Sequence, residues 1–561
     1  MAAIENTYRE PTYGNWRRPR RAGIGTLGGL ATAGLFLGLI VTVICFFIGG
    51  WLAGLIALIV LGLALAVVSV NDKHNKSLGA RAFGRLAFRS ARRKKTNIYR
   101  SGPLGLTPWG EFQLPGIAAG SKLYEFHDSY GRPFALIHLP STAHYTVVFG
   151  TQPDGASLVD PEQVDAWVAN WGGWLASLSN EPAVVAASVT VETAPDSGAR
   201  LRREVESNIH DDAPAIAKAM LREALETYPQ GSATIRAWVA LTFSAAARSG
   251  GKRRTAEEIA RDLASRLPGL TERLESTGAG ACAPLNAQEL CEVVRVAYDP
   301  AAARLIDEAH YQGTPVDLTW GEVGPSAHQA DWAAYRHDSG HSVSWTMTGA
   351  PRGHILSSVL ARLVAPHAEI DRKRVTLLYR PIESGRAAAI VESDQTNALT
   401  RASSMTGAPR GHILSSVLAR LVAPHAEIDR KRVTLLYRPI ESGRAAAIVE
   451  SDQTNALTRA SSTNRPTARA LVDARAAQAT AAEEAKGAGL VNFGMVVTAT
   501  VLSARGLDDA VATVEGNLGP SARLLMRRAY GSQDSAFAAS LPLGLVLPKH
   551  LKVPEEIREA M

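Results

Sequence analysis

The stretch AGIGTLGGLATAGLFLGLIVTVICFFIGGWLAGLIALIVLGLALAVVSV occupies residues 22–70 and contains no Asp, Glu, Lys, Arg or His in 49 residues. A single straight helix of this length would measure about 74 Å, whereas the hydrocarbon core of a bilayer is about 30 Å thick. The Gly49–Gly50 pair provides a natural break, and Trp51, a residue type that favours the membrane interface, follows it. We therefore predict two transmembrane helices, at Ile24–Phe47 and Trp51–Val70.

This stretch has two alternative interpretations. A buried helical hairpin in a large soluble core would not need 49 residues without a single charge or histidine. A cleaved export signal has an apolar core of about 7–15 residues and a small-residue cleavage site after it, and neither feature is found here. The membrane hairpin is therefore the preferred prediction.

Basic residues flank the apolar stretch on both sides. Residues 1–21 contain five arginines, and residues 71–100 contain ten lysines and arginines. Loops rich in Lys and Arg stay on the cytoplasmic side of a membrane. We therefore predict a two-span protein of the inner cell membrane, with a basic N-terminus at residues 1–21, transmembrane helices within residues 22–70, and both termini in the cytoplasm.

The charge of the chain is unevenly distributed. The net charge of the chain is +7, yet residues 1–100 hold 15 Lys/Arg and only three acidic residues, whereas the rest holds 45 basic and 50 acidic residues. A mildly acidic body does not favour a broad nucleic-acid-binding surface, because phosphate contacts need clustered Lys and Arg. The length of the body allows two or three domains of ordinary size.

A basic segment, residues 71–101, joins the apolar stretch to the body. At 100° per residue, arginines from Arg81 to Arg92 fall on one side of a helix, whereas Phe83 and Leu86 fall on the other, and Phe88 interrupts the basic side. Such a helix suits an anionic leaflet, where each basic residue contributes about 1 kcal/mol; contact with nucleic acid is the alternative. The residues predicted to contact the membrane surface are Arg81, Arg85, Arg89, Arg92 and Arg93.

The rest of the chain alternates strand-like and helical patterns, after a linker predicted at Tyr99–Pro103. The predicted strands are Phe134–Leu139, Tyr145–Phe149, Val184–Glu192, Ile235–Phe243 and Phe493–Leu502. Helices are predicted from Asp160-Pro161, from the capping boxes Thr255/Glu258 and Asn286/Glu289, and at 212–227, 466–486 and Leu507–Glu515. The predicted fold class is a membrane α-helical hairpin followed by a cytoplasmic α+β body of mixed strands and helices, divided into residues 102–345, 346–462 and 463–561.

The middle segment, residues 346–462, contains a tandem repeat. Met347–Ser404 and Met405–Ser462 are identical over all 58 residues. Structural repeats normally diverge because each copy has different neighbours, so identity indicates a recent duplication or an error of sequence assembly. Each copy is predicted as helix, strand and helix, at Ile355–Val364, Arg374–Arg380 and Glu383–Arg401 in the first copy and at Ile413–Val422, Arg432–Arg438 and Glu441–Arg459 in the second. We expect the fold to need only one copy, and we interpret the other as a unit without a function of its own rather than as a purposeful repeat.

The motifs that would carry catalysis are incomplete. Gly250–Arg253 ends in Arg where a phosphate-binding loop needs Ser or Thr. His337, Asp338 and His341 are close enough in sequence to bind a metal or move protons, yet Ser339-Gly340 favours a turn that enters a strand over the helix of a metalloprotease motif. We predict no catalytic residue, no cofactor and no metal.

Several stretches carry a resemblance to conjugative type IV secretion systems. The hairpin resembles the PrgI-like, two-span inner-membrane subunit in having Tyr8, Pro11, Tyr13, Trp16 and Pro19 before it and YRSGPLG (99–105) after it. The body resembles the N-terminal part of the large conjugation ATPase at KRVTLLYRPI (373–382 and 431–440), EEAKGAGLVNFGMVVTATV (483–501) and RRAYGSQDSAFAASLPLG (527–544). In those ATPases the motor follows the last of these segments, and here no phosphate loop is found. The resemblance therefore implies a motor-less, membrane-tethered component, as in actinobacterial mobile elements, and transfers no catalytic residue.

The preferred hypothesis is a non-enzymatic scaffold of a DNA-transfer apparatus in the inner membrane. Its expected partners are the lipid bilayer, a secretion ATPase or coupling protein, other subunits of the machine and further copies of this chain, with no small-molecule substrate. The alternatives are a membrane component of a type VII protein-secretion apparatus and a membrane-tethered enzyme that uses His337, Asp338 and His341.

Overall fold

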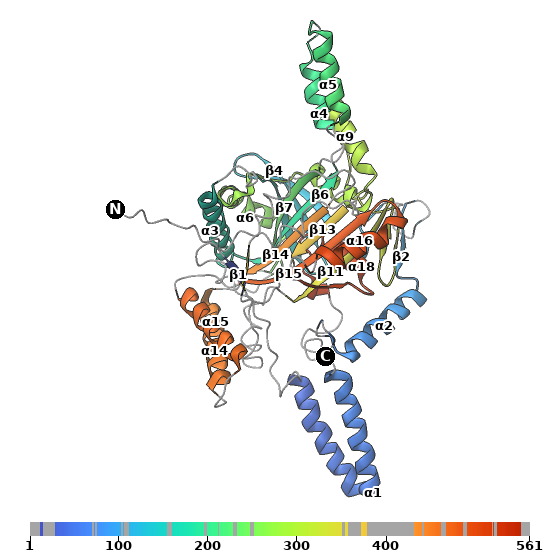
Figure 1. Cartoon of the computed structure of the whole chain (residues 1–561), viewed down its shortest axis with the longest axis vertical. Coiled ribbons are helices and arrows are strands. Elements are labelled where there is room, and N and C mark those ends of the chain that lie inside the picture. Colours follow the sequence, from blue (N-terminus) through green and yellow to red (C-terminus); the bar gives the residue numbers. More distant parts are fainter. Residues whose placement is uncertain are drawn as a thin grey trace, which may run out of the picture.

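The structure is a computed structural model of the chain, and it has a long apolar helix near the N-terminus followed by a body of mixed helices and mainly antiparallel strands (Figure 1). This architecture confirms the predicted order of an apolar helical segment and an α+β body. The residues that the structure describes are 12–14, 29–69, 72, 74, 76–102, 105, 112–153, 160–195, 199–210, 212–227, 233–246, 252–349, 354–356, 372–377, 431–439, 442–461, 467–485, 491–518, 520 and 524–550.

Helix α1 (Gly29–Ser69) is apolar throughout. Its segment Gly34–Ala66 is long and apolar enough to cross a membrane, and only 6% of its most apolar window is buried inside the protein. Within α1, Gly50 has non-helical dihedral angles (φ 73°, ψ −176°), which glycine adopts without the steric cost that a Cβ atom would add. Gly38 packs so closely against the side chain of Leu61 that a Cβ atom at this position would overlap it.

The described strands form one sheet of 14 strands and a separate pair. The sheet order is β2-β9-β10-β11-β15-β13-β14-β6-β7-β5-β4-β3, with β16 paired to β11 and β8 paired to β5. The strands are β2 (Ile98–Arg100), β3 (Lys122–His127), β4 (Pro133–Leu139), β5 (His144–Gln152), β6 (Val184–Pro195), β7 (Ala233–Ser244), β8 (Ala281–Pro284), β9 (Ala327–Ala330), β10 (Tyr335–His337), β11 (Gly340–Gly349), β13 (Arg372–Leu377), β14 (Lys431–Pro439), β15 (Val491–Val501) and β16 (Leu525–Arg528). The separate pair joins β1 (Thr12–Gly14) to β12 (His354–Leu356).

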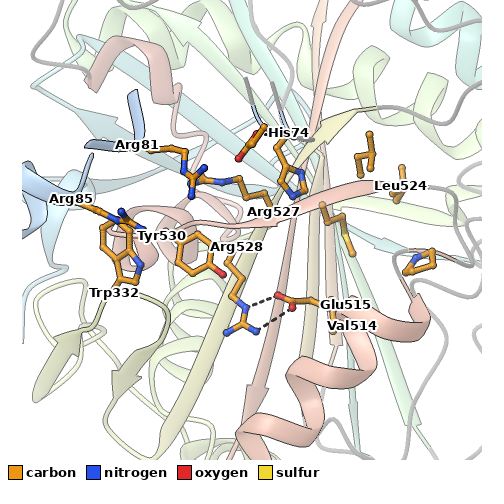
Figure 2. A pocket seen from close by; sticks show the side chains of 14 residues that line it. His74, Arg81, Arg85, Trp332, Val514, Glu515, Leu524, Arg527, Arg528 and Tyr530 are labelled. Atoms are coloured by element: carbon orange, nitrogen blue, oxygen red, sulfur yellow. Dashed lines mark hydrogen bonds and ion pairs between the residues drawn. The ribbon is translucent and has the colours of Figure 1, made fainter. Parts of the chain in front are cut away.

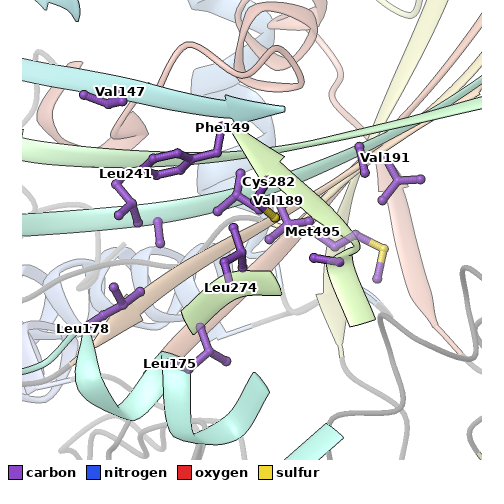
Figure 3. Packing of buried hydrophobic residues seen from close by; sticks show 14 of the residues in the cluster. Val147, Phe149, Leu175, Leu178, Val189, Val191, Leu241, Leu274, Cys282 and Met495 are labelled. Carbon is purple, nitrogen blue, oxygen red and sulfur yellow. The ribbon is translucent and has the colours of Figure 1, made fainter. Parts of the chain in front are cut away.

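An apolar cluster lies on each face of the sheet. Successive residues of a strand point to opposite faces, so one strand contributes to both clusters. Phe134 and Leu136 of β4 belong to one apolar cluster, and Ala135 and Ile137 belong to the other. Figure 3 shows part of the first cluster, where Leu175 approaches side chains of the strands. Burial of apolar area at about 25 cal/mol per Å² makes these two clusters the main source of stability of the body.

The helices form the outer layers. The first cluster includes residues of α3 (Pro161–Ser177), α6 (Ala256–Ala264), α7 (Leu267–Leu274) and α16 (Leu507–Thr513), and the second includes residues of α8 (Ala287–Tyr298) and α18 (Gln533–Ala539). Two further groups of helices lie away from the sheet (Figure 1). One is α14 (Ser442–Ser461) with α15 (Ala468–Glu484). The other, α4 (Ala199–Asn208) and α5 (Ala215–Thr227) with α9 (Ala302–Gln312), projects at the end opposite to α1.

Local sequence signals located most of these elements correctly. The strands predicted at Phe134–Leu139 and Ile235–Phe243 lie within β4 and β7. Both predicted capping boxes are present: Thr255 and Glu258 cap α6, and Asn286 and Glu289 cap α8 through reciprocal hydrogen bonds. The predicted linker at Tyr99–Pro103 was wrong in part, because Ile98–Arg100 pair with β9 as strand β2.

The structure describes the two repeat copies unequally. In the second copy, the predicted strand and last helix are confirmed as β14 and α14. In the first copy the predicted strand is confirmed as β13 over Arg374–Leu377, and residues 378–380 lie outside the described residues. The helix predicted at Ile355–Val364 was wrong at its start, because His354–Leu356 form β12 against β1 and interstrand pairing overrides the helical spacing. The predicted helices Glu383–Arg401 and Ile413–Val422 lie outside the described residues.

The strands of the two copies have the same partners in the sheet. Lys431 of β14 and Lys373 of β13 both pair with Thr193 of β6. Arg432 and Arg374 likewise both pair with Glu192. Both strands also pair with β15 and, in parallel, with each other. The two copies therefore meet the same partners between β6 and β15, at what we call the central strand position.

Candidate functional site

The basic segment after α1 contains helix α2 (Leu78–Arg93), as the sequence predicts. The helix begins after Ser77, whose hydroxyl accepts a hydrogen bond from the Ala80 amide at 3.2 Å. Arg92 and Arg93 lie in its last turn, where cations interact favourably with the helix dipole. Because none of the residues of α2 is buried, its position depends on a few contacts with the body.

A series of aromatic ring contacts attaches α2 to the body. The ring centroid of Phe88 lies 5.3 Å from that of Trp332, in an edge-to-face arrangement. Trp332 in turn stacks on Tyr530 at 5.7 Å, and the guanidinium group of Arg527 lies over the Tyr530 ring at 5.3 Å. Gly531 (φ 75°) allows this close packing, because a Cβ atom there would lie 2.7 Å from the Trp332 ring.

A pocket of about 550 Å³ lies between α2, the segment that follows α1, and strand β16 (Figure 2). Its lining includes Arg81 and Arg85 of α2, Asp72 and His74 before the helix, and Trp332, Glu515, Arg527, Arg528 and Tyr530 of the body. Counting His as neutral, the four arginines exceed the two carboxylates by two charges. The pocket is therefore electropositive, and its volume suits a small anionic group.

The carboxylates of the pocket are already engaged. Glu515 accepts hydrogen bonds from Arg528 Nε (2.5 Å) and Nη2 (3.1 Å), and this pairing raises the pKa of Arg528. Asp72 accepts the backbone N–H groups of His74 and Lys76, at 2.8 and 3.1 Å. Although burial opposes ionisation of Asp72, these hydrogen bonds keep its pKa below the usual value, so it is a fixed carboxylate.

The arginines of the pocket are less well compensated. Burial lowers the pKa of Arg527, and the nearby charge of Arg81 lowers it further, against the opposing effects of Asp72 and Tyr530. The side chains of Arg81 and Arg85 make no hydrogen bond or ion pair with any residue that the structure describes. Arg81, Arg85 and Arg527 thus line the pocket with Asp72 as the one carboxylate of the lining that Arg528 does not occupy (Figure 2).

The five arginines that were predicted to touch the membrane surface separate into two groups. Arg81, which is half-buried, and Arg85, which is exposed, line the pocket, whereas Arg89, Arg92 and Arg93 are exposed and do not belong to its lining. On the apolar side of α2, Phe83 and Leu86 are exposed by 55% and 61%. Phe88, which interrupts the basic side in the sequence, is the residue that contacts Trp332. Contact of all five arginines with a membrane stays a prediction.

Sequence reasoning missed the body's share of this pocket. The stretch RRAYGSQDSAFAASLPLG contains Arg527, Arg528 and Tyr530. The sequence indicated a resemblance to the conjugation ATPase at this stretch, and did not predict a binding surface there. The pattern of two arginines followed by an aromatic residue was a usable signal. Nothing in the sequence placed Trp332 opposite Phe88.

His337, one of the three residues considered for catalysis, is a structural residue of the β10–β11 hairpin. Its side chain is fully buried, and Nδ1 lies 2.5 Å from the carbonyl oxygen of Tyr298, to which it donates. Its Nε2 lies 2.7 Å from the Ser342 hydroxyl, which lies 2.7 Å from the hydroxyl of Thr500. The imidazole therefore has both nitrogens bonded inside the sheet, as buried polar groups require.

Asp338 and His341 lie on the same hairpin. Asp338 accepts the Ser326 amide at 2.8 Å and lies 3.2 Å from Arg295; burial raises the pKa of this carboxyl group against these contacts. His341 lies on β11 opposite Arg336, and burial and this charge lower its pKa. The turn predicted at Ser339-Gly340 is confirmed. Among the described residues, no three His, Cys, Asp or Glu side chains are grouped as metal ligands.

The comparisons with known proteins concern mainly the N-terminal part of the chain. Residues 20–80 match a family that is described as a domain of unknown function (DUF8461). No curated protein sequence matches the chain. The family match spans α1, Asp72 and His74 of the pocket, and the first residues of α2.

Proposed function

We propose that this chain is a non-enzymatic membrane scaffold that crosses the inner membrane twice and holds its body at the cytoplasmic face as part of a DNA-transfer machine. The observation that carries the proposal is the apolar, exposed helix α1 with its break at Gly50. Exposed apolar side chains of this length need a lipid environment, because water cannot cover them without a large free-energy cost.

The contact between Gly38 and Leu61 supports two spans. These residues are 23 positions apart and would lie about 35 Å apart in a straight helix. Their contact requires the chain to reverse direction between them, and Figure 1 draws two arms of α1 side by side. With the break at Gly50, each arm has about 20 residues, enough for one crossing. Under this proposal, two crossings and the positive-inside bias of the basic flanks favour a cytoplasmic location for both ends of α1.

The assignment to a conjugative machine is supported by the resemblance of three stretches of the body, which meet in the fold. KRVTLLYRP forms β14, residues 491–501 form β15, and residues 525–528 and 533–539 form β16 and α18. Strand β15 pairs with both β14 and β11, and β16 pairs with β11. The resembling stretches therefore form one block next to the membrane-proximal pocket.

Membrane anchorage is tested with the full chain and two double variants. Leu39→Arg/Leu58→Arg introduces one charge near the middle of each arm, where each costs about 2.5–3.5 kcal/mol, and Leu39→Ala/Leu58→Ala is the matched control. We expect the wild type and the alanine variant to resist extraction by alkaline carbonate and the arginine variant to be released or degraded. Release of the wild type by carbonate would overturn the proposal.

Topology and partners need separate measurements. Protease should digest the body in inverted vesicles and leave it intact in spheroplasts; the opposite pattern contradicts the cytoplasmic location. Mild crosslinking in cells followed by detergent extraction should recover a secretion ATPase or coupling protein with this chain. Recovery of the chain alone would overturn the scaffold role, and recovery of small secreted helical-hairpin substrates would favour the type VII alternative.

A further inference from the structure

The position of the pocket relative to α1 sets the depth at which a ligand would meet it. Asp72 follows the last residue of α1, Ser69, by three residues, which span at most about 11 Å. Given the proposed membrane anchorage, on which this inference rests, the pocket lies at the level of the lipid headgroups. A phosphate group of the inner leaflet is then the nearest abundant anion.

The orientation of α2 agrees with this depth. Arg81 and Arg85 turn toward the pocket, and Phe83 and Leu86 on the opposite side are exposed. An amphipathic helix next to a bilayer buries its apolar side at the boundary of headgroups and acyl chains. With Phe83 and Leu86 in that boundary, Arg81 and Arg85 point away from the hydrocarbon and toward the body.

The chemistry of the pocket favours a phosphate oxygen over other ligands. Within the lining, Asp72 is the one carboxylate left to face Arg81, Arg85 and Arg527, because Glu515 is taken by Arg528, so the pocket keeps an excess of positive charge that an anion would relieve. Guanidinium groups bind phosphate through paired N–H donors. Arg528 is not counted, because Glu515 already accepts two of its hydrogen bonds. Trp332 and Tyr530 add the aromatic surface found where proteins meet the interface.

We propose that this pocket binds the phosphate group of an anionic phospholipid, which bridges α2 and the body. Arg81 and Arg85 contribute from α2, and Arg527 contributes from the body. The bound lipid stabilises the docking of α2, because it replaces the repulsion between Arg81 and Arg527 with two attractions.

The test compares two charge-matched double variants of the full chain purified in detergent. Arg81→Gln/Arg85→Gln removes two pocket charges, and Arg89→Gln/Arg92→Gln removes two exposed charges from the same helix. Binding of phosphatidylglycerol and of phosphatidylcholine is titrated by native mass spectrometry. We expect the pocket variant to weaken phosphatidylglycerol binding about 30-fold, as the loss of two basic contacts of about 1 kcal/mol each predicts, and the control to change it less than threefold.

Each other outcome contradicts the inference. Equal weakening in both variants means general attraction of the basic helix to an anionic surface, and no weakening in either means that the pocket takes no lipid. Inorganic phosphate at 10 mM, added as a competitor, separates the two sources of the anion: displacement of the lipid at this concentration assigns the pocket to a free phosphorylated ligand. A carbonate-resistant chain that fails to bind lipid overturns this inference alone, whereas release of the chain by carbonate overturns the membrane anchorage itself.

Discussion

The two copies of the repeat have the same sequence, yet they enter the sheet from different points of the chain. The second copy places β14 at the central strand position, where it pairs with β6 from Lys431 to Tyr437 and with β15 from Arg432 to Pro439. The first copy places the shorter β13 at the same position, in the same register with β6, from Lys373 to Thr376. The partner strands therefore decide where KRVTLL goes, whichever copy supplies it.

One position cannot hold two strands at once. A strand offers two edges of N–H and C=O groups, and one edge of β6 is already paired with β7. The remaining edge can accept β14 or β13 along any one stretch, since each backbone group makes one ladder hydrogen bond. In the structure the two strands also pair in parallel with each other, from Arg374 and Arg432 to Leu377 and Leu435. We therefore infer that the two copies compete for this position, and along the described residues β14 has the longer pairing. A one-copy chain that lacks residues 347–404, compared with the full chain, tests whether the two copies are equivalent.

The largest effect is expected for Thr434→Pro in the one-copy chain. Proline removes a backbone donor from the middle of β14 and costs about 3 kcal/mol or more, which corresponds to an apparent Tm about 6–12 °C lower. In the full chain the same substitution should lower Tm by less than half as much, because Thr376 pairs with the same residue of β6, Thr190. Thermal unfolding in detergent, followed by tryptophan fluorescence, measures both.

The matched control for this prediction is Thr376→Pro in the full chain, which should leave Tm unchanged as long as β14 fills the position. Equal losses for Thr434→Pro in the one-copy and full chains would show that the first copy cannot replace the second. The comparison between the copies would then fail, and β13 would have no share in the native sheet.

A smaller effect is expected for the charge opposite Glu192, a residue of β6 that is only 2% exposed. The register pairs Glu192 with Arg432 and Arg374 on one side and with Arg236 of β7 on the other, and a buried carboxylate is stabilised by cationic neighbours. In the one-copy chain, Arg432→Gln should cost about 2 kcal/mol. Arg438→Gln, on the same strand opposite Asn492, is the matched control and should cost less than about 0.5 kcal/mol.

In the full chain, Arg432→Gln and Arg374→Gln can be combined in a double-mutant cycle that measures the free energy of unfolding. Arg432→Gln and Arg374→Gln should each have little effect alone, because the other copy keeps an arginine available for Glu192. The double variant should show the whole loss seen in the one-copy chain. Additive effects of the two single variants would mean that both arginines act at separate sites, contrary to a shared position.

The sequence predicted the elements that local rules determine. The missing charges between Ala22 and Val70 indicated the apolar segment that became α1, and the capping pairs at Thr255 and Asn286 located the starts of α6 and α8. These signals act over at most a few turns of chain, so no tertiary contact had to be known. The strands with β-branched runs, such as β7, were found for the same reason.

The pocket and the shared strand position were beyond such rules. Arg81 and Arg527 are separated by most of the chain, and only the packing of Phe88 on Trp332 brings them together. His354–Leu356 have helical spacing in the sequence, yet they form a strand because they pair with residues 12–14, more than 300 positions away. Sheet order has the same cause: the partners of KRVTLL are set by the edges of β6 and β15, which the sequence does not show.

The smallest effect is expected for removing one whole copy. Removal of residues 347–404 or of residues 405–462 gives the same polypeptide, because the copies are identical, and in that chain a single KRVTLLYRP strand fills the central strand position. The connection from β11 to this strand becomes 58 residues shorter, and the lower cost of closing a shorter loop stabilises the fold by about 1 kcal/mol. We therefore expect the Tm of the one-copy chain to equal or slightly exceed that of the full chain. A Tm lower by more than about 5 °C would show that the first copy contributes packing of its own, and the two copies would then be complementary parts of the fold instead of alternatives for one position.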